Sequence, residues 1–153
     1  MSTPDISVEV CKEYTPEMAA GIGRLMPQLD ESFPPAPIPE GRLRYLIDSP
    51  DYDQLVAVAN KIHVVGAATM SVVRGAGFGQ RGQLEDFVVD EEHRGSGVAG
   101  QMWSLMLEWC AGKGLEDFYL QTETYRPGAI KFYEKHAALL GETVTFKGDT
   151  TKQ

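Results

Sequence analysis

Cysteine, basic residues and long apolar runs are all scarce in this chain, and each shortage excludes a class of protein. The two cysteines, Cys11 and Cys110, lie far apart, and neither belongs to a C-x-x-C pair. Neither a disulfide framework nor a zinc knuckle is therefore expected. No apolar run is long enough to span a bilayer, and no basic-then-apolar leader opens the chain. We expect a soluble cytoplasmic protein with no membrane partner.

Acidic residues outnumber lysine and arginine by 22 to 14, which gives a formal net charge of -8. Binding of nucleic acid needs clustered Lys and Arg to neutralise phosphates, and the sequence has no such cluster. We expect no nucleic-acid partner and a weak preference for a cationic substrate. The histidines, His63, His93 and His136, are scattered without metal-ligand spacing, so no metal site is predicted.

The length and composition are those of one globular unit. A chain of 153 residues lies within the single-domain range, and 42% hydrophobic with 24% charged residues is close to the globular average. We predict a single domain over residues 1–153.

Hydrophobic periodicity and turn residues predict an alternation of strands and helices. Thr15-Pro16-Glu17 supplies an N-cap, a first-turn proline and an acid, and Asn60-Lys61 separates two β-rich runs as a hairpin turn would. Residues 32–39 contain four prolines and residues 75–82 are glycine-rich, so both are expected to be loops. The predicted strands are 6–10, 54–59, 62–73, 84–89, 115–122 and 144–146, and the predicted helices are 15–29, 40–47, 98–112 and 127–138.

This order predicts an α/β fold of the α+β type. The strand, helix and strand from Leu84 to Thr122 must form a right-handed parallel crossover, whereas the hairpin upstream is antiparallel. A mixed sheet with helices on both faces follows.

The most informative segment is the glycine loop Arg94-Gly95-Ser96-Gly97-Val98-Ala99-Gly100, between a strand and a helix. Glycines there allow a sharp turn that leaves backbone N–H groups bare, and the helix dipole favours an anion by about 0.3 to 1 kcal/mol. Arg94 adds a possible charge-assisted contact. The segment predicts a site for a diphosphate.

The glycine loop has three other interpretations. A Walker A loop fails because Gln101-Met102 stands where Lys and Ser or Thr are needed. A dinucleotide fingerprint fits the glycine spacing, with Glu123 as the ribose-binding acid, but too few βα units follow for a doubly wound fold. A tight turn without any ligand is the third alternative.

Arg94-Gly95-Ser96-Gly97-Val98-Ala99 matches the Q/R-x-x-G-x-G/A motif of the GNAT superfamily of N-acetyltransferases. The stretch from Leu84 to Ala137 resembles the cofactor-binding half of that family, and the element order extends the resemblance over about residues 6–146. Residues 25–29, the proline loop and residues 84–90 resemble a group of uncharacterised bacterial members. The resemblance implies a mixed, mostly antiparallel central sheet of six to seven strands with helices on both faces.

The resemblance also implies acetyl-CoA as cosubstrate. In the family the backbone of the central strand meets the acetyl group and pantetheine arm, and the glycine loop holds the pyrophosphate. The residues implied at the cosubstrate are Phe87, Val88, Val89, Arg94, Gly95, Ser96, Gly97, Val98, Ala99 and Tyr125. Tyr125 stands where many members have an asparagine.

Two catalytic residues are implied in the same way. Glu85 resembles the glutamate of an L-E-D-F segment that is regarded as the base in spermidine/spermine acetyltransferases, and Tyr133 resembles the tyrosine of an F-Y-E-K segment that commonly acts as general acid. In a regular strand Glu85 shares a face with Phe87 and Val89, although a bulge would break that parity. The alternatives are that Glu85 caps or salt-bridges a strand start and that Tyr133 is a half-buried packing residue.

The predicted function is therefore acetyl transfer from acetyl-CoA to the amine of a small molecule, by direct attack in a ternary complex. A non-catalytic acyl-CoA-binding regulatory module and an NAD-binding oxidoreductase are the alternatives. Residues 25–45 would cover the acceptor, where Asp30, Glu31, Phe33 and Tyr45 favour a cationic amine, although exposed acids in a loop are usually only solvated. Polyamines, aminoglycosides, amino acids and peptide N-termini stay open, and a homodimer is possible because dimers are common in the family.

Overall fold

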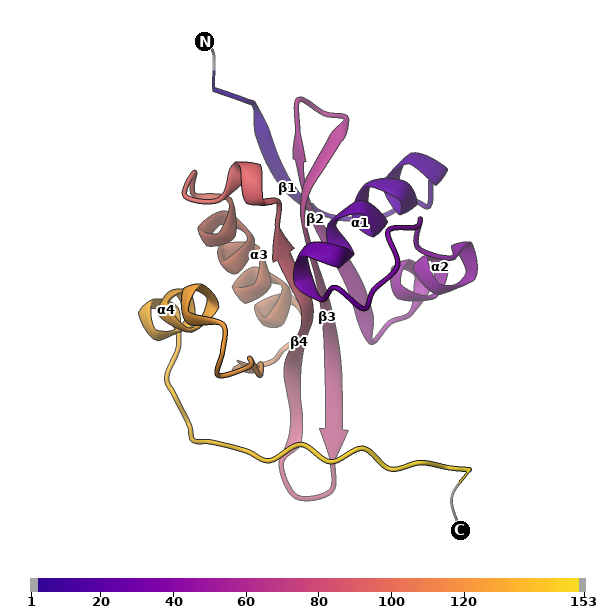
Figure 1. The fold of residues 1–153 in the computed structure, drawn as a ribbon. Coiled ribbons are helices and arrows are strands. Elements are labelled where there is room, and N and C mark those ends of the chain that lie inside the picture. The colour runs from indigo at the N-terminus through magenta and orange to yellow at the C-terminus, as the bar shows by residue number, and fades with distance from the viewer. Residues whose placement is uncertain (1–2, 152–153) are drawn as a thin grey trace. The chain divides into compact units, whose positions relative to one another are not determined.

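The structure is a computed structural model that describes residues 3–151. The chain divides into two compact units, Met1–Leu120 and Gln121–Gln153, which are described separately. The elements of the first unit, labelled in Figure 1, are β1 (Ile6–Val10), α1 (Pro16–Leu29), α2 (Glu40–Asp48), β2 (Tyr52–Ala59), β3 (His63–Gly75), β4 (Gly79–Val89), the short 3-10 helix η1 (Glu91–His93), α3 (Val98–Gly112) and β5 (Phe118–Tyr119). The second unit contains α4 (Pro127–His136).

The sheet of the first unit is mixed and mostly antiparallel, as predicted. Its order is β1-β2-β3-β4-β5, in which the first four strands pair antiparallel and β5 lies parallel to β4. Five strands are present among the described residues, so the prediction of six to seven was wrong. Residues 115–122 contain only the two-residue β5, and residues 144–146 form no strand. Val144 and Phe146 are 78% and 88% exposed, and a β-prone segment forms a strand only against cross-strand neighbours.

Local signals set the ends of the first elements. The Thr15 side chain accepts a hydrogen bond from Met18 N–H at 3.0 Å and Pro16 begins α1, as the sequence predicted. Asn60 and Lys61 both have left-handed φ angles, 52° and 68°, and Ile62 N–H donates to the Ala59 carbonyl at 3.2 Å. The hairpin turn lies at the predicted residues, but the loop contains three residues, Asn60 to Ile62, because Ala59 pairs with His63.

The predicted loop at residues 75–82 was wrong. β3 and β4 pair continuously down to Gly75 and Gly79, with Val73 opposite Arg81. Backbone pairing in this long hairpin thus continues through a glycine-rich, polar stretch, although the side chains there show no alternation of apolar and polar residues.

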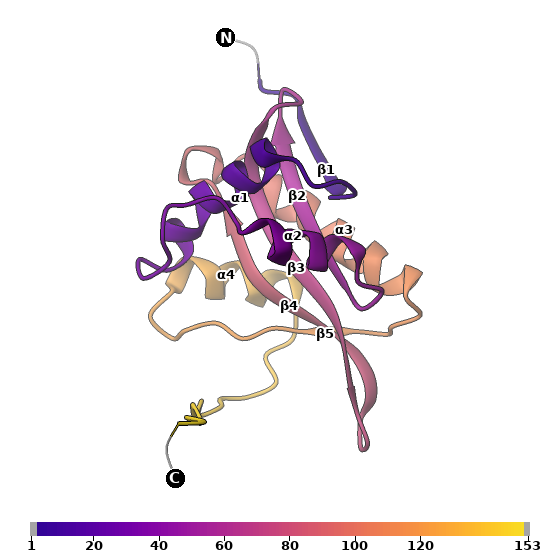
Figure 2. The ribbon, with the colours of Figure 1, turned by 90° about the vertical axis from the view of Figure 1, so that its right-hand side faces the viewer.

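Helices cover both faces of the sheet, as predicted (Figures 1 and 2). α1 and α2 pack on one face, where Ala19, Ile22 and Leu25 of α1 share a buried cluster with Ala67 of β3 and Val88 of β4. α3 packs on the opposite face, where Met102 lies directly over Gly66 of β3. We call these the α1/α2 face and the α3 face.

The proline loop between α1 and α2 approaches α1 very closely at Gly23. A Cβ atom at this position would lie only 2.0 Å from the Ala36 carbonyl oxygen, and Ile38 N–H donates to the Ala19 carbonyl at 3.0 Å. Glycine is therefore required there for the loop to rest on the helix backbone.

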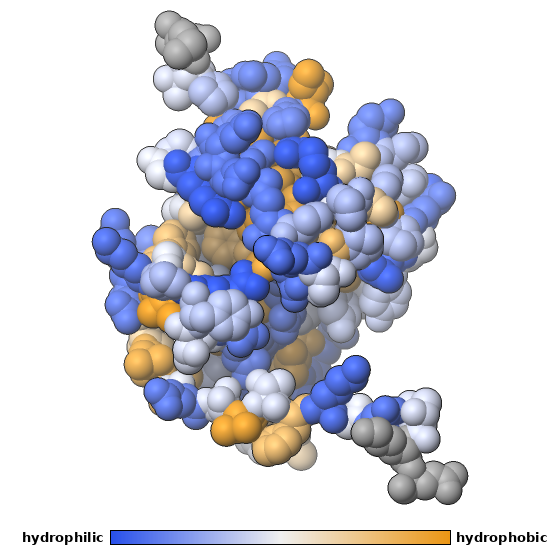
Figure 3. All heavy atoms as spheres, in the orientation of Figure 1, coloured by the Kyte–Doolittle hydropathy of each residue, from blue (hydrophilic) through white to orange (hydrophobic). Residues whose placement is uncertain are grey.

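The second unit consists of α4 and an extended C-terminal segment. The Phe132 ring stacks on His136 at 4.2 Å between centroids and meets Tyr133 edge-on at 5.7 Å. Residues 137–149 form neither helix nor strand, and Leu139 and Leu140 are 84% and 74% exposed. Figure 3 shows apolar side chains, drawn in orange, at the surface of this C-terminal segment. Within residues 3–151, no helix is long and apolar enough to cross a membrane.

Candidate active site

A β-bulge interrupts the middle of β4. Thr69 of β3 pairs with Glu85 and Ala67 pairs with Val88, so Ala68 alone stands opposite both Asp86 and Phe87. Asp86 has a left-handed φ of 49°. This conformation disfavours most side chains by about 1–2 kcal/mol, and Asp is among the few residues that tolerate it.

The bulge changes the face on which Glu85 lies. β3 alternates regularly here, so Thr69 lies on the same face as Ala67, and Ala67 packs under α1. Glu85, opposite Thr69, therefore projects from the α1/α2 face together with Val88. The strand is thus not regular, and the bulge separates Glu85 from the face of Phe87 and Val89 because the extra residue reverses the alternation, which is the exception that the sequence analysis allowed.

Glu85 is exposed and has an environment that favours its protonated form. Partial burial and then the charge of Asp86 raise the pKa of the Glu85 carboxyl, while a hydrogen bond from Gln83 Nε2, at 3.4 Å, opposes them. Partial burial also raises the pKa of Asp86. Among residues 3–151, neither carboxylate forms an ion pair within 4.0 Å, so nothing in the structure supports a salt-bridging role for Glu85.

One edge of β4 is open beyond the bulge. β5 pairs only with Gly82 and Gln83, and no other strand among the described residues pairs on that side. Asp90 N–H donates to the Val65 carbonyl at 2.8 Å, so by antiparallel alternation Val88 hydrogen-bonds with β3 while Val89 directs its N–H and C=O to the open side. Arg94 Nε donates to that Val89 carbonyl at 3.0 Å.

The glycine loop follows directly. Gly95 and Gly97 have left-handed φ angles of 78° and 90°, and Gly97 is the N-cap of α3 without a capping side chain. Within the part of the chain that is described, no backbone N–H from Gly95 to Gly100 donates to a backbone carbonyl, and the Ser96 hydroxyl is turned back to the His93 carbonyl.

The space above this loop is open. Apart from the adjacent residues and the backbone of α3 itself, no heavy atom of residues 3–151 lies within 4 Å of the position that a Cβ would take at Gly95, Gly97 or Gly100. Bare amides, a helix N-terminus and free space together fit the diphosphate of a CoA nucleotide. Side chains do not plug the turn.

Asp90, which the sequence analysis did not single out, ties this loop to α1. The side chain is 2% exposed and accepts hydrogen bonds from Arg24 at 3.1 Å, Gln28 at 3.3 Å and Glu92 N–H at 3.3 Å. Burial tends to raise the pKa of Asp90, but these hydrogen bonds and the Arg24 charge outweigh it and hold the pKa below its usual value. The only signal in the sequence is an acid at the end of an apolar strand, because Arg24 lies 66 residues away.

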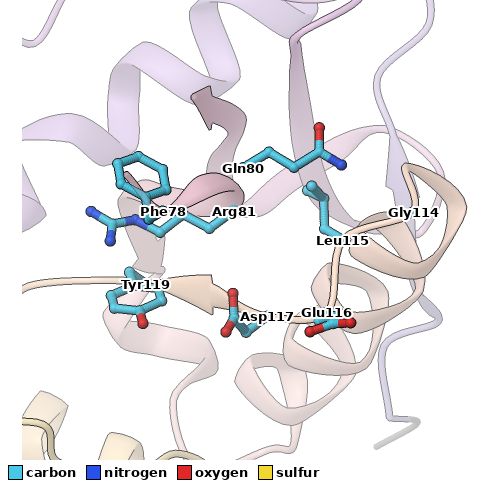
Figure 4. Close-up of a pocket in the computed structure, with 8 residues that line it drawn as sticks. All are labelled: Phe78, Gln80, Arg81, Gly114, Leu115, Glu116, Asp117 and Tyr119. Atoms are coloured by element: carbon cyan, nitrogen blue, oxygen red, sulfur yellow. The ribbon is translucent and has the colours of Figure 1, made fainter. Parts of the chain in front are cut away.

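A pocket of about 370 Å³ lies elsewhere, at the N-terminal ends of β4 and β5. Figure 4 shows the Arg81 guanidinium between the rings of Phe78 and Tyr119, and its carbon lies 4.3 Å and 4.2 Å from their centroids. None of the predicted site residues lines this pocket, whereas the glycine loop follows the opposite end of β4.

The remaining predicted residues belong to the second unit. Tyr125 is 71% exposed, with the Arg126 guanidinium 5.6 Å from its ring centroid. Burial raises the pKa of Tyr133 to about 12, although the charge of Arg126 opposes the shift. Glu85, Phe87, Val88, Val89 and the glycine loop are thus brought together in the first unit, and Tyr125 and Tyr133 lie in the second.

Known proteins share this fold. The chain is 33% identical over 76 residues to the uncharacterized N-acetyltransferase YobR of Bacillus subtilis (strain 168), a match that covers 50% of this chain and 29% of that protein. The chain therefore spans less than a third of the length of the curated relative it matches.

Two solved structures illustrate the similarity over nearly the whole chain. The aminoglycoside acetyltransferase meta-AAC0020 from an uncultured soil metagenomic sample, in complex with sisomicin, superposes with a TM-score of 0.80 at 18% identity, over 96% of this chain and 97% of that one. AAC(6')-Iy, in complex with the bisubstrate analogue CoA-S-monomethyl-acetylneamine, superposes with a TM-score of 0.76 at 16% identity, over 95% and 99%. At these identities the likeness shows the fold alone.

The sequence model of the Acetyltransferase (GNAT) family matches residues 23–138, which include the second half of α1, the bulged strand, the glycine loop and α4. The mostly antiparallel sheet is also incompatible with the doubly wound parallel fold of a dinucleotide-binding domain. This chain belongs to the GNAT family of acetyltransferases.

Proposed function

We propose that this protein is an acetyl-CoA-dependent N-acetyltransferase that acetylates the amine of a small molecule. The observation that carries the proposal is the row of unpartnered amides from Gly95 to Gly100, at the start of α3 and next to the open edge of β4. The family membership supports acetyl transfer, and the neighbours that act on aminoglycosides favour a small-molecule amine.

The first unit supplies the binding groups for the cosubstrate. The amides of the glycine loop hold the diphosphate, and Arg94, whose Nε is engaged by Val89, presents the rest of its guanidinium at the exposed loop. The Val89 N–H faces the open edge and is the backbone donor available to the thioester arm. Acetyl-CoA, when bound, supplies an acetyl group activated as a thioester, whose C–S bond breaks as the amide C–N bond forms.

Glu85 is the proposed base. An alkyl ammonium has a pKa near 10.4, so a proton must leave the acceptor nitrogen before it can attack. The Glu85 carboxylate lies on the α1/α2 face and has no cationic partner among residues 3–151, and its raised pKa makes it a better proton acceptor than an ordinary glutamate. The proton passes to it directly or through one water.

Tyr133 is the proposed acid for the leaving thiolate. With a pKa of about 12 its phenol stays protonated at neutral pH and holds the proton that the sulfur needs. A thiol has a pKa near 8.5, so this transfer is uphill, and close positioning of the phenol must compensate.

Thiol release from acetyl-CoA tests the activity on kanamycin, spermidine, L-lysine and a tripeptide. We expect turnover with at least one amine, and a Tyr133→Phe variant that keeps its acetyl-CoA affinity but loses about 10-fold or more in kcat. Stabilisation by acetyl-CoA without turnover on any amine would favour the regulatory binding module. Thermal stabilisation by NAD and not by acetyl-CoA would overturn the proposal.

A further inference from the structure

A polar row crosses three strands on the α1/α2 face. Gln54 of β2 pairs with Thr69 of β3, and Thr69 pairs with Glu85 of β4. Gln54 is buried at 4% exposure, Thr69 is partly exposed and Glu85 is exposed, so the row opens toward β4.

The orientation of the buried Gln54 amide is unambiguous. Its Nε2 donates to the carbonyl oxygens of Leu55 at 3.1 Å and Ala68 at 3.0 Å. A carbonyl oxygen only accepts, so the NH₂ end of the amide must lie there. The Oε1 end is consequently the one that faces Thr69.

This orientation determines what the Thr69 hydroxyl offers to a ligand. Thr69 Oγ1 lies 3.1 Å from Gln54 Oε1, and because the amide oxygen only accepts, the hydroxyl must donate its single proton to it. The remaining lone pairs of Oγ1 can only accept. Directly across the strand, the Glu85 carboxylate is also an acceptor, at the typical Cβ separation of about 4.5–5.5 Å for such pairs.

Two adjacent acceptors suit a ligand group with several donors. Gln83 Nε2 donates to the Oε1 atom of Glu85 at 3.4 Å, and among residues 3–151 the other carboxylate oxygen accepts no hydrogen bond, which leaves it for a ligand. A primary ammonium has three N–H groups and can donate to both residues at once, whereas a tertiary ammonium has one.

We propose that Thr69 is an acceptor-binding residue, whose hydroxyl oxygen accepts an N–H of a primary ammonium while Glu85 accepts a second one. The proposal rests on the function proposed above and deepens it, because it specifies primary over tertiary amines. Gln54 contributes as a positioning residue by holding the Thr69 proton away from the ligand.

Two substitutions of Thr69, compared on a primary and a tertiary amine, test the inference. Thr69→Val keeps the shape and β-branching of the side chain but removes the oxygen, and Thr69→Ser keeps the oxygen as a matched control. We expect Thr69→Val to raise KM for a primary amine about 10- to 100-fold, the usual effect of a hydrogen bond to a charged group, with little change in kcat. Thr69→Ser should stay within about 3-fold of the wild type.

Calorimetry on the CoA-saturated protein provides the second readout. Thr69→Val should weaken binding of n-butylammonium by the same factor and leave binding of N,N-dimethylbutylammonium unchanged. Wild-type turnover with an equal effect of Thr69→Val on both amines, or with no effect, overturns the inference and leaves the proposed function standing. Absence of both turnover and amine binding in the wild type overturns both.

Discussion

At the scale of single residues, the proposed chemistry depends on one carboxylate and its immediate neighbour. Glu85 and Asp86 are adjacent in sequence, but Asp86 has a left-handed backbone and lies in the bulge, whereas Glu85 pairs with Thr69. The charge of Asp86 is the second cause of the raised pKa of Glu85. The proposal therefore gives the two residues separable roles, Glu85 in proton transfer and Asp86 in tuning the pKa of Glu85.

Glu85→Gln should lower kcat about 100-fold or more and leave the Kd of acetyl-CoA unchanged, because it removes the proposed proton acceptor and no group that is proposed to bind the cosubstrate. In the wild type, the active form is the ionised carboxylate with a raised pKa, so the rate should fall as pH drops through a value above that of an ordinary glutamate. The acidic limb of the pH profile of kcat/KM, where the rate falls as pH drops, measures this effect.

Asp86→Asn is the matched control, since Asn also tolerates the left-handed conformation. It should keep most of the activity and move the acidic limb to lower pH, because the neighbouring negative charge is gone. A larger loss of kcat in Asp86→Asn than in Glu85→Gln would assign the base to Asp86.

At the scale of elements, the glycine loop and its anchor to α1 carry the site. Gly97 caps α3 in a left-handed conformation, and Asp90 joins β4, η1 and α1 through its hydrogen bonds. The glycine loop is therefore exposed on one side, while the hydrogen bonds of Asp90 attach the end of β4 to α1 on the other.

Gly97→Ala should destabilise the protein by about 1–2 kcal/mol, because a side chain is strained at a φ of 90°. It should also weaken acetyl-CoA binding, since relief of the strain moves the loop amides. Urea unfolding and calorimetry measure the two effects. Gly100→Ala is the control for stability, because that residue is helical and, within residues 3–151, its added Cβ would meet no atom within 4 Å beyond its own helix backbone, so it should be neutral or stabilising.

Asp90→Asn should destabilise the fold by about 1–3 kcal/mol at pH 7, since the buried hydrogen bonds lose their charge and one acceptor oxygen. The pKa of Asp90 is lowered in the folded state, so its contribution is present above the ordinary aspartate pKa and is lost as pH falls through the folded value. The difference between wild type and variant in urea unfolding should therefore shrink at acid pH. A difference that is constant from pH 7 to pH 3 would contradict the ion pair as its source.

At the scale of the whole molecule, the net charge of the chain influences how the two proposed substrates approach it. A formal charge of -8 attracts a cationic amine and repels an anionic nucleotide at long range, and salt screens both effects within about 10 Å at 0.1 M. We expect KM for a polycationic amine such as spermidine to rise several-fold between about 0.02 and 0.5 M KCl. The association rate of acetyl-CoA should rise over the same range. Salt-independent values for both would show that the field plays no part.

The predicted single domain over residues 1–153 stays a prediction, as do the roles of Glu85, Tyr133 and Tyr125. The fold class, the first two helices and the α3 helix were predicted well, because periodicity and caps are read from residues close in sequence. The strand count and the length of the β3–β4 hairpin were not, since these follow from pairing between distant segments.

The sequence by itself determined the local features: the cap at Thr15, the turn at Asn60-Lys61 and the glycine loop that begins α3, each encoded by a few neighbouring residues. Only the tertiary structure decided which face Glu85 occupies, which partner neutralises Asp90 and how Gln54 orients the Thr69 hydroxyl. The physical reason is that the register of a sheet and the satisfaction of buried polar groups depend on residues tens of positions away, which no local pattern specifies.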